Sequence, residues 1–297
     1  LLACKERQGG MPVTVIRQLG YPLSDRVGLL VSPEVPGLLD MALVQIRRRI
    51  RFSYVQFNEI TEKSALASGL DKWKENFWFS ESRISCRVPV HEVTEADREE
   101  PPGKVKFKYE LRRARKHTEN LGAIVHRVTP DEDTIGSVIN SIIDVEDSSW
   151  KGVEGVGVFS APDSRQWMIS SFARLARDGY VRVAAMELGG RYISYRLGLV
   201  DKGRLFDFNV AFLEEFSRIG SGRLLLDEWI RWGLDEGWQW VDASRVSLHD
   251  SNHQLHERCT YFEEHKRWTY YERNLSGFYA GIIYKVWQVV KPLLKKG

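Results

Sequence analysis

The chain lacks the features that mark several special classes of protein. No apolar run reaches the length of about 18 residues that a membrane-spanning helix needs. We also expect no signal peptide, because Leu1–Cys4 is followed at once by Lys5, Glu6 and Arg7. The three cysteines, Cys4, Cys86 and Cys259, are odd in number, far apart and without metal-site spacing. This usage predicts a reducing, cytoplasmic setting instead of a disulfide framework.

The chain also lacks a strong excess of charge of either sign. Lys and Arg number 43 against 40 Asp and Glu, which gives a net charge of +3. Bulk electrostatics therefore does not predict a nucleic-acid-binding protein. Aromatic residues are plentiful, with 13 Phe, 11 Tyr and 10 Trp, and their buried area excludes intrinsic disorder. A length of 297 residues predicts two packed domains or one large one.

The first third of the chain predicts a small α+β unit over residues 1–91. The β-type runs 1–5 and 13–17 flank Gln8-Gly9-Gly10 and predict a hairpin. The elements expected after it are a strand at 27–31, a helix that is opened by residues 33–36 and ends at 47–49, a strand at 52–57, a weaker helix at 61–75 and a long strand or hairpin at 77–90. Residues 92–103 are charged, contain Pro101-Pro102-Gly103 and lack apolar periodicity, so they predict a linker.

In the second unit, the helix-capping and turn signals in the sequence are clearer. A basic helix is expected at 104–121, a strand at 123–128, and a helix from Pro130 to about Asp147, after a capping box at Thr129. The elements expected next are a helix from Pro162 to 178, antiparallel strands at 180–188, 191–200 and 204–210, a helix at 223–236, a strand at 238–242, a helix at 252–265, a strand at 267–272 and a terminal helix at 276–295.

Both units show the same order of elements, except that the first lacks an opening strand and two helices. A duplicated α+β domain whose first copy is truncated at its N-terminus explains both. We therefore expect a partial first domain at 1–91, a linker at 92–103, a second domain at 104–275 and a basic amphipathic helix at 276–297.

Four segments resemble a known family. They are the helix Lys108–Lys116, the loop Ser149-Trp150-Lys151-Gly152, the hairpin Leu188–Arg191 and the segment Phe216–Leu226. Together they resemble the CelD/BcsL-like acyltransferases of the GNAT superfamily, which are related to Fem-type peptidyltransferases. The resemblance covers residues 104–245 well and the first hundred loosely. It implies tandem GNAT-like domains of the α+β class, with mixed, mostly antiparallel sheets flanked by helices. The sequence departs from the family at Ser217-Arg218 in the phosphate loop and at Asp242-Ala243-Ser244.

The phosphate loop predicts where an acyl-CoA donor binds. Gly220, Ser221 and Gly222 are small, so backbone N–H groups at the start of the next helix can approach a pyrophosphate, and Arg218 and Arg223 flank them. The corresponding loop of the first unit, residues 32–37, carries Glu34 and two prolines and offers fewer donors. The donor is therefore expected in the second unit.

The acceptor amine needs a base, and its tetrahedral intermediate needs a hydrogen-bond donor. Asp242, at the end of a strand, is the first catalytic candidate, for base or acceptor contact. Lys151 is the other catalytic candidate: it could pair with an acidic group of the acceptor, or could be exposed beside a buried Trp150. Ser149, Trp150 and Asn209 are expected to contact the acceptor. No Ser/His/Asp or Cys/His arrangement stands out, which favours direct transfer. No metal is expected, although His249, His253, His256 and Cys259 are open to three interpretations: zinc ligands, a base or a polar helix face.

The family resemblance implies N-acyl transfer from acyl-CoA to an amine in cell-envelope, exopolysaccharide or lipid biosynthesis. Two alternatives stay open: a Fem-like transferase that uses aminoacyl-tRNA, and a non-catalytic GNAT scaffold. The helix at 104–121 could contact phosphate of a donor, a lipid or RNA. Residues 276–297 could dock on the protein, or could lie on the inner face of an anionic membrane as a peripheral contact.

Overall fold

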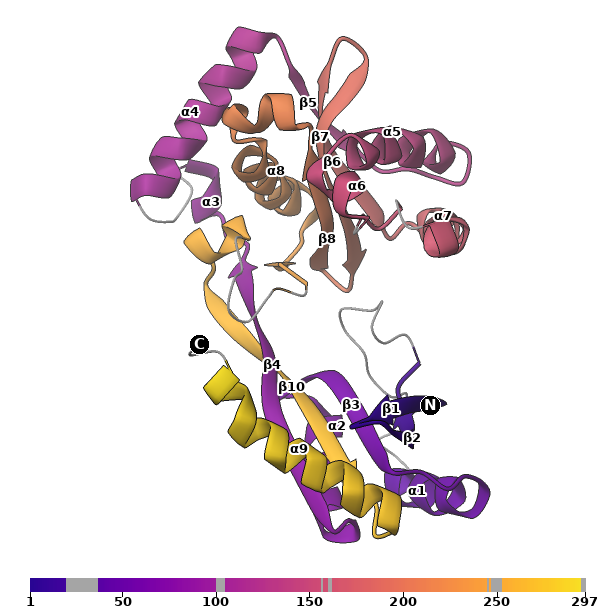
Figure 1. Ribbon diagram of the computed structural model, residues 1–297. Helices are drawn as coiled ribbons and strands as arrows, with labels where there is room; N and C mark the ends of the chain where they lie inside the picture. Colours follow the sequence, from indigo (N-terminus) through magenta and orange to yellow (C-terminus); the bar gives the residue numbers. More distant parts are fainter. Residues whose placement is uncertain are drawn as a thin grey trace. The chain divides into compact units, whose positions relative to one another are not determined.

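The structure is a computed structural model that describes residues 1–19, 37–99, 105–155, 157–159, 162–244, 246 and 253–294. These residues form two compact units (Figure 1). The first contains residues 1–87 and the C-terminal residues from 263 on, and the second contains residues 88–246 and the described residues up to 262. The sequence predicted a boundary near residue 91 and assigned residues 263–275 to the second domain. The difference arises because β10 (Tyr261–Tyr271) pairs with β3 (Tyr54–Thr61), a strand of the first unit.

The first unit begins with the predicted hairpin. Strands β1 (Leu2–Gln8) and β2 (Met11–Arg17) pair antiparallel across Gly9 and Gly10, whose φ angles are 55° and 84°. That left-handed conformation is why glycine occupies both turn positions. After helix α1 (Leu38–Arg49), β3 pairs parallel to β2, and then β10 and β4 (Phe79–Glu92) follow in the sheet. The strand predicted at 27–31 lies outside the described residues.

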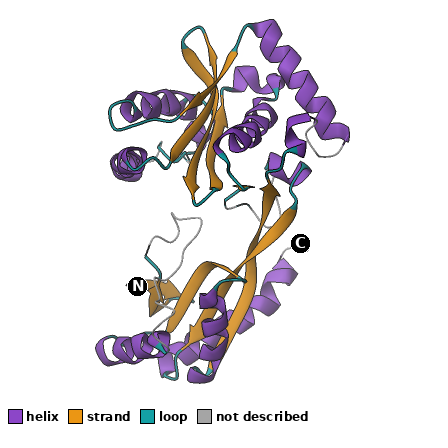
Figure 2. Ribbon diagram, turned by 180° about the vertical axis from the view of Figure 1, so that it is seen from behind, coloured by secondary structure: helices purple, strands orange, loops and turns teal. Residues whose placement is uncertain are grey.

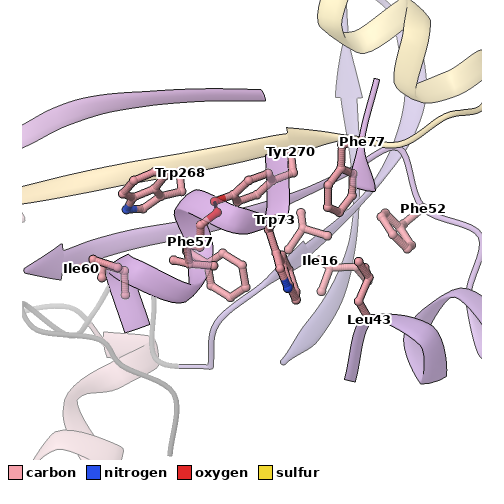
Figure 3. Packing of buried hydrophobic residues seen from close by; sticks show 12 residues of the cluster. Ile16, Leu43, Phe52, Phe57, Ile60, Trp73, Phe77, Trp268 and Tyr270 are labelled. Atoms are coloured by element: carbon pink, nitrogen blue, oxygen red, sulfur yellow. Dashed lines mark hydrogen bonds between the residues drawn. The ribbon is translucent and has the colours of Figure 1, made fainter. Parts of the chain in front are cut away.

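Two apolar cores cover the two faces of this sheet. On one face α1 and α2 (Ala65–Trp73) bury Leu43 and Trp73 against Phe57 and Tyr270 (Figure 3). On the other face helix α9 (Leu275–Leu294) places Ala280 against Val13, Val15, Tyr54 and Tyr271. Neighbouring residues such as Tyr270 and Tyr271 point to opposite faces, as the period of two in a strand requires. The predicted terminal helix therefore docks on the protein along one side. A short 3-10 helix η1 (Lys74–Asn76) links α2 to the residues before β4.

The second unit is a mixed sheet in the order β4-β9-β8-β7-β6-β5. Residues 90–92 of β4 pair antiparallel with β9 (Trp240–Asp242), which pairs parallel with β8 (Arg204–Phe212). The remaining strands pair antiparallel and are β7 (Arg191–Asp201), β6 (Val181–Leu188) and β5 (Ile124–Val128). Both predicted hairpins are confirmed, with Gly189, Gly190, Lys202 and Gly203 in left-handed turn conformations.

Helices cover both faces of this second sheet. Helices α5 (Ile135–Asp147), α6 (Trp150–Glu154) and α7 (Pro162–Arg177) lie on one face, whereas α4 (Val105–Leu121) and α8 (Ser221–Glu236) lie on the other (Figures 1 and 2). Buried Leu225, Leu226 and Trp229 of α8 supply the apolar side that packs on the strands. The remaining short helices are α3 (Ala96–Glu99), η2 (Glu214–Ile219) and η3 (Gln254–Glu257). Helix α3 lies within the segment predicted as a linker.

Two helix predictions were wrong. The helix expected to begin at Pro130 begins at Ile135, because Asp131 Oδ1 accepts hydrogen bonds from the N–H groups of Asp133 (3.1 Å) and Thr134 (2.9 Å) and holds a turn before the helix. The helix expected at 252–265 is only the short η3, followed by β10. The helical spacing of apolar residues in this segment gave the wrong prediction, because the segment forms a strand only through pairing with β3. That partner lies about 200 residues earlier in the chain, so a local pattern cannot indicate it.

The predicted α+β class with mostly antiparallel sheets is confirmed. Each unit repeats one arrangement: β2, α1 and parallel β3 in the first, and β8, α8 and parallel β9 in the second. Helices connect parallel strands because a tight turn cannot. In the second unit, α8 begins after the end of β8 and leads the chain back to β9.

Candidate active site

The structure brings together two residues that the sequence predicted separately. The ammonium of Lys151, on α6, donates a hydrogen bond to Oδ1 of Asn209, on β8. Asn209 is buried, and Lys151 is partly buried. Ser149 caps α6 by accepting the Lys151 backbone N–H at 3.2 Å, so the cap fixes where the lysine leaves the helix. These contacts predict a defined position for one amine group on this face of the sheet.

A buried carboxyl group fixes the orientation of Asn209. Glu146, on α5, has no exposed surface and accepts four hydrogen bonds. Two come from the backbone N–H groups of Val158 (3.1 Å) and Phe159 (2.8 Å), one from the hydroxyl of Tyr195 (2.9 Å) and one from Nδ2 of Asn209 (2.5 Å). Asn209 Nδ2 also lies 2.9 Å from the Tyr195 hydroxyl, so its Oδ1 is left to face Lys151. The network preorganises the acceptor of the lysine ammonium.

Burial changes the protonation of this cluster. Removal from water lowers the pKa of Lys151, the carboxylates of Glu146 and Asp207 oppose that change, and Arg196 adds to it. Burial raises the pKa of Tyr195 well above its ordinary value, and Glu146 raises it further, so the phenol stays protonated and donates. The neutral form of Lys151 is therefore reached at a lower pH than for an exposed lysine, and that form can accept a proton.

A second buried pair connects this cluster to the predicted phosphate loop. Arg196, on β7, has no exposed surface, and its guanidinium donates to Asp207, to Gln254 Oε1 at 2.5 Å and to the Gly222 carbonyl at 2.9 and 3.1 Å. Arg196 alternates along β7 with Tyr195 and so reaches the opposite face. The contact ties the first turn of α8 to the central strand.

The residues predicted as a phosphate loop lie at the N-terminus of α8, which begins two residues earlier than expected. Gly220, with φ of 78°, precedes α8, and Ser221 and Gly222 are the first residues of the helix. A Cβ atom added at Gly222 would lie 3.2 Å from the Gln254 side chain, so the position is narrow. The first backbone N–H groups of a helix have no partner within it and carry partial positive charge, which favours a phosphate.

The basic side chains near this loop differ in whether an acidic residue already binds them. Arg218 is exposed beside it, and its carbonyl lies 3.3 Å from Nδ1 of His117 on α4. Arg223, in contrast, makes two hydrogen bonds of 2.6 and 2.7 Å to Glu257. Helix α4 contacts η2, just before the loop, and exposes Arg112 and Lys116. Positive charge for a phosphate is therefore available from α4 as well as from the loop itself.

Asp242 lies in a different cluster from Lys151, whereas Ser149 and Trp150 are its neighbours in the chain. Asp242, at the end of β9, is fully buried, accepts from Arg204 Nη1 at 3.1 Å and accepts the Ser244 N–H at 2.8 Å. It therefore belongs to a different cluster. Ser149 is buried as the cap described above, while the neighbouring Trp150 is 46% exposed and faces solvent.

The histidine segment does not form the helix face that its spacing suggested. His253 caps η3: its Nδ1 accepts the Leu255 N–H at 3.2 Å, and its Nε2 lies 3.2 Å from Asp207. His256 stacks at a tilt on Phe262, with ring centroids 5.6 Å apart. His249 lies outside the described residues. Within the described part of the chain, the one group with metal-ligand geometry contains none of these histidines.

A comparison with known families decides the broader assignment. Residues 105–254, about half of the chain, match the Acetyltransf_6 model, the acetyltransferase (GNAT) domain. The chain belongs to this family. Within the GNAT domain, the match includes Lys151, Asn209 and the loop at Gly220–Gly222. No curated protein matches the chain.

Solved structures share the fold over both units. The chain is similar to the C-terminal domain (DUF2156) of a protein assigned as a lysylphosphatidylglycerol synthetase from Agrobacterium fabrum, with 11% identity, a TM-score of 0.59 and coverage of 96% of this chain and 85% of that one. It is similar to FemX with 11% identity, a TM-score of 0.59 and coverage of 97% and 86%. It is also similar to L-PGS from Bacillus licheniformis with 10% identity, a TM-score of 0.53 and coverage of 92% and 81%. At these identities, the likeness concerns the fold of this GNAT protein.

Proposed function

We propose that the protein is an N-acyltransferase that moves an acyl group from acyl-CoA to an amine acceptor. The observation that carries the proposal is the position of Lys151 in the family's GNAT domain. Its side-chain nitrogen is hydrogen-bonded to the amide oxygen of Asn209, and burial lowers its pKa, which favours the neutral form. In the transfer, the acceptor nitrogen attacks the thioester carbonyl carbon. The C–N bond forms, the C–S bond breaks, and the proton lost by the amine passes to Lys151 Nζ and then to the departing CoA sulfur.

The donor is proposed to bind at the start of α8. Its pyrophosphate would accept hydrogen bonds from the N–H groups of Ser221 and Gly222, with Arg218 nearby. Arg223 is proposed as a supporting residue, because its guanidinium is already engaged by Glu257. The transfer as proposed needs no metal.

A β-bulge supplies a candidate donor for the developing oxyanion. The register of β7 with β8 shifts between Leu197 and Gly198, which face Asn209 and Asp207, so Phe208 is an extra residue on β8. A bulged residue leaves the hydrogen-bond ladder, and its backbone groups become available to a ligand. We propose that this bulge, next to Asn209, receives the thioester carbonyl.

Asp242 is proposed as a positioning residue. Its carboxyl group is buried, paired with Arg204 and bonded to the Ser244 N–H, and Ser244 has a positive φ of 58°. The contacts hold the chain as it leaves β9, beside the parallel strand β8. Lys151 thus takes the proton-transfer role for which the sequence ranked Asp242 first.

Exposed apolar residues on the helix that carries Lys151 support an acceptor with an apolar part. Trp150 and Val153 of α6 are 46% and 88% exposed. Large exposed apolar groups are typical of binding surfaces. Among the relatives in fold, one is named as a lysylphosphatidylglycerol synthetase, so a lipid is one acceptor class to test along with sugar and peptide amines.

A peripheral membrane contact through α9 is also proposed. None of the helices in the described part of the chain is both long and apolar enough to cross a bilayer. The outer side of α9 nevertheless exposes Ile282, Val286, Trp287 and Val289 at 44–69%. A cavity of about 250 Å³ borders this helix, and Arg83, Arg267 and Lys291 are among the residues that line it. Apolar groups beside cations suit an anionic lipid surface, with the protein near the inner face of a membrane.

The membrane proposal is tested by liposome flotation of the full chain. With vesicles that contain an anionic phospholipid, Val289→Asp should reduce flotation because it places a charge on the exposed apolar side. Met41→Asp, at an exposed position of α1, is the matched control. Equal flotation of the wild-type chain and Val289→Asp would exclude the contact.

The alternative donor is an aminoacyl-tRNA. The exposed basic residues of α4 next to the phosphate loop favour it, as does the likeness in fold to FemX. Calorimetric titration of the full chain with acetyl-CoA, a long-chain acyl-CoA and aminoacyl-tRNA separates the two donors. We expect saturable binding of a CoA thioester. Binding of aminoacyl-tRNA alone would overturn the CoA assignment and favour the alternative.

A further inference from the structure

A second cluster of buried polar groups lies in the first unit, within its sheet. Glu59 on β3, Cys86 on β4 and His265 on β10 are each exposed by 1% or less. One ligand-type atom from each residue, a carboxylate oxygen, the thiol sulfur and a ring nitrogen, lies within 4.8 Å of both others. Among the described residues, this is the only such group of three metal-ligand side chains.

The distances within the cluster match coordination of one ion. Glu59 Oε2 lies 3.3 Å from Cys86 Sγ and 3.5 Å from His265 Nδ1. Two ligands of a tetrahedral zinc ion lie about 3.4–3.6 Å apart, given Zn–S, Zn–N and Zn–O bonds of about 2.0–2.3 Å. The set of one sulfur, one nitrogen and one oxygen donor also has the chemistry that zinc prefers.

The buried ring of His265 makes the fewest hydrogen bonds of the three side chains in the cluster. Its side chain has no exposed surface, and neither ring nitrogen has a hydrogen-bond partner among the described residues. An imidazole buried in this state loses its bonds to water without replacing them. A metal ion bound by Nδ1 would satisfy that nitrogen.

The backbone near Glu59 is bent in a way that directs its side chain. The register of β3 with β10 shifts between Phe57 and Ile60, so Asn58 and Glu59 form a bulge, and Glu59 has a φ of 52°. Left-handed conformations of non-glycine residues cost free energy, and bulges re-aim side chains. Ser85 Oγ supports the group, since it lies 3.1 Å from both Glu59 Oε2 and the His265 carbonyl oxygen.

We propose that Glu59, Cys86 and His265 bind one Zn²⁺ ion, which links strands β3, β4 and β10. On binding, the Cys86 thiol releases to solvent the proton that it now donates to Glu59 Oε2, and the sulfur becomes a thiolate ligand beside the carboxylate. The three protein ligands leave a fourth position for water. The ion is structural: it takes no part in the proposed acyl transfer, whose residues belong to the GNAT domain.

The test is metal analysis of the full chain produced with zinc and dialysed against zinc-free buffer. We expect about one zinc ion per chain in the wild-type protein, reduced at least tenfold in Cys86→Ser and in His265→Gln. Cys259→Ser, which removes a cysteine outside the cluster, should retain the ion. Zinc content that is absent from the wild type, or unchanged in both cluster variants, would overturn the proposal.

A spectroscopic measurement avoids dependence on how the variants fold. The wild-type chain refolded with Co²⁺ in place of Zn²⁺ should show a thiolate-to-cobalt charge-transfer band and the intense d–d bands of tetrahedral coordination. The same spectrum should persist in Cys259→Ser. A spectrum without the charge-transfer band would contradict ligation by Cys86.

Discussion

The two units of the protein each bury a carboxyl group beside a nitrogen base, but they surround it differently. In the second unit, Glu146 accepts four hydrogen bonds, and the network that it organises ends at Lys151. In the first unit, Glu59 lies beside Cys86 and His265, and both ring nitrogens of the histidine lack a hydrogen-bond partner among the described residues.

The difference shows what each cluster is suited to do. A network rich in N–H and O–H donors has satisfied its carboxyl group and needs no added cation. It holds the side chain of Lys151, whose pKa is lowered by burial, in the position that our proposal of proton transfer requires. In the first unit a thiol, a carboxylate and an imidazole lie close together, and this set of donor atoms is one that a zinc ion binds. Under the two proposals made above, the same kind of buried pair would support chemistry in one unit and stability in the other.

The largest effect is expected from Lys151→Met, which removes the proposed proton carrier but keeps an unbranched side chain. Transfer should fall by about 10²–10⁴-fold. The temperature of unfolding near neutral pH should not fall, because burial lowers the pKa of Lys151 and the charged form costs stability below that pKa. Steady-state kinetics and thermal unfolding measure the two effects.

Lys72→Met, at an exposed position of α2, is the control for that substitution and should leave transfer unchanged. A Lys151→Met protein that transfers at the wild-type rate would contradict a catalytic role of Lys151 and, with it, the proposed difference between the two units.

Stability should also depend on pH. Between the lowered pKa of Lys151 and its ordinary value, the wild-type protein should become more stable as pH rises. In that range the unfolded chain binds the proton and the folded one does not.

A smaller effect, on the donor, is expected from Gly222→Glu. The substitution places a side chain 3.2 Å from Gln254 and a negative charge where phosphate is proposed to bind. Affinity for acetyl-CoA should fall by about tenfold or more, which corresponds to about 1.4 kcal/mol. Titration calorimetry measures it. Gly136→Glu, on the open side of α5, provides the comparison, and equal losses in the two variants would argue against the site.

Glu146→Gln tests whether the carboxyl group organises the second cluster. The amide cannot accept all four donors, so the protein should lose about 1–3 kcal/mol of stability in denaturant unfolding. Glu146 raises the pKa of Lys151, and its removal should move the acid limb of the pH–rate profile to lower pH. A shift toward higher pH would show that another group sets the profile.

The smallest effect on activity is expected from the first unit. His265→Gln should leave the rate of transfer per folded molecule unchanged while lowering the temperature of unfolding. A chelator present during refolding should mimic the variant in the wild-type protein. Loss of transfer without loss of folded protein would mean that the buried cluster of the first unit contributes to the chemistry.

Local patterns in the sequence were enough for much of the fold. Turn glycines such as Gly9, Gly10, Gly189 and Gly190 predicted hairpins because only those backbone conformations close a two-residue turn. The loop before α8 was predicted in the same way. The place of β10 in the sheet of the first unit was not predicted, because its pairing with β3 connects residues about 200 positions apart.

The candidate site could be predicted only in part. Lys151 and Asn209 were both named, but not their contact, because a strand and a short helix meet there through tertiary packing. Glu146 was not predicted. It lies on the same buried side of α5 as Ile139 and Ile142, and a charged residue on the apolar side of a helix could have indicated a buried functional group. Tyr195 and Arg196 lie in a strand whose alternation predicts burial but not partners. The cluster at His265 was missed because its three residues are distant in sequence.

The pH dependence of kcat/KM for transfer from acetyl-CoA to an amine tests the account most directly. With an acceptor whose own pKa lies outside the range studied, the wild-type rate should rise with pH through an apparent pKa below the ordinary lysine value of about 10.4. The residual activity of Lys151→Met should lack that limb. A limb that persists unchanged in Lys151→Met would contradict the assignment of Lys151 as the group that carries the proton.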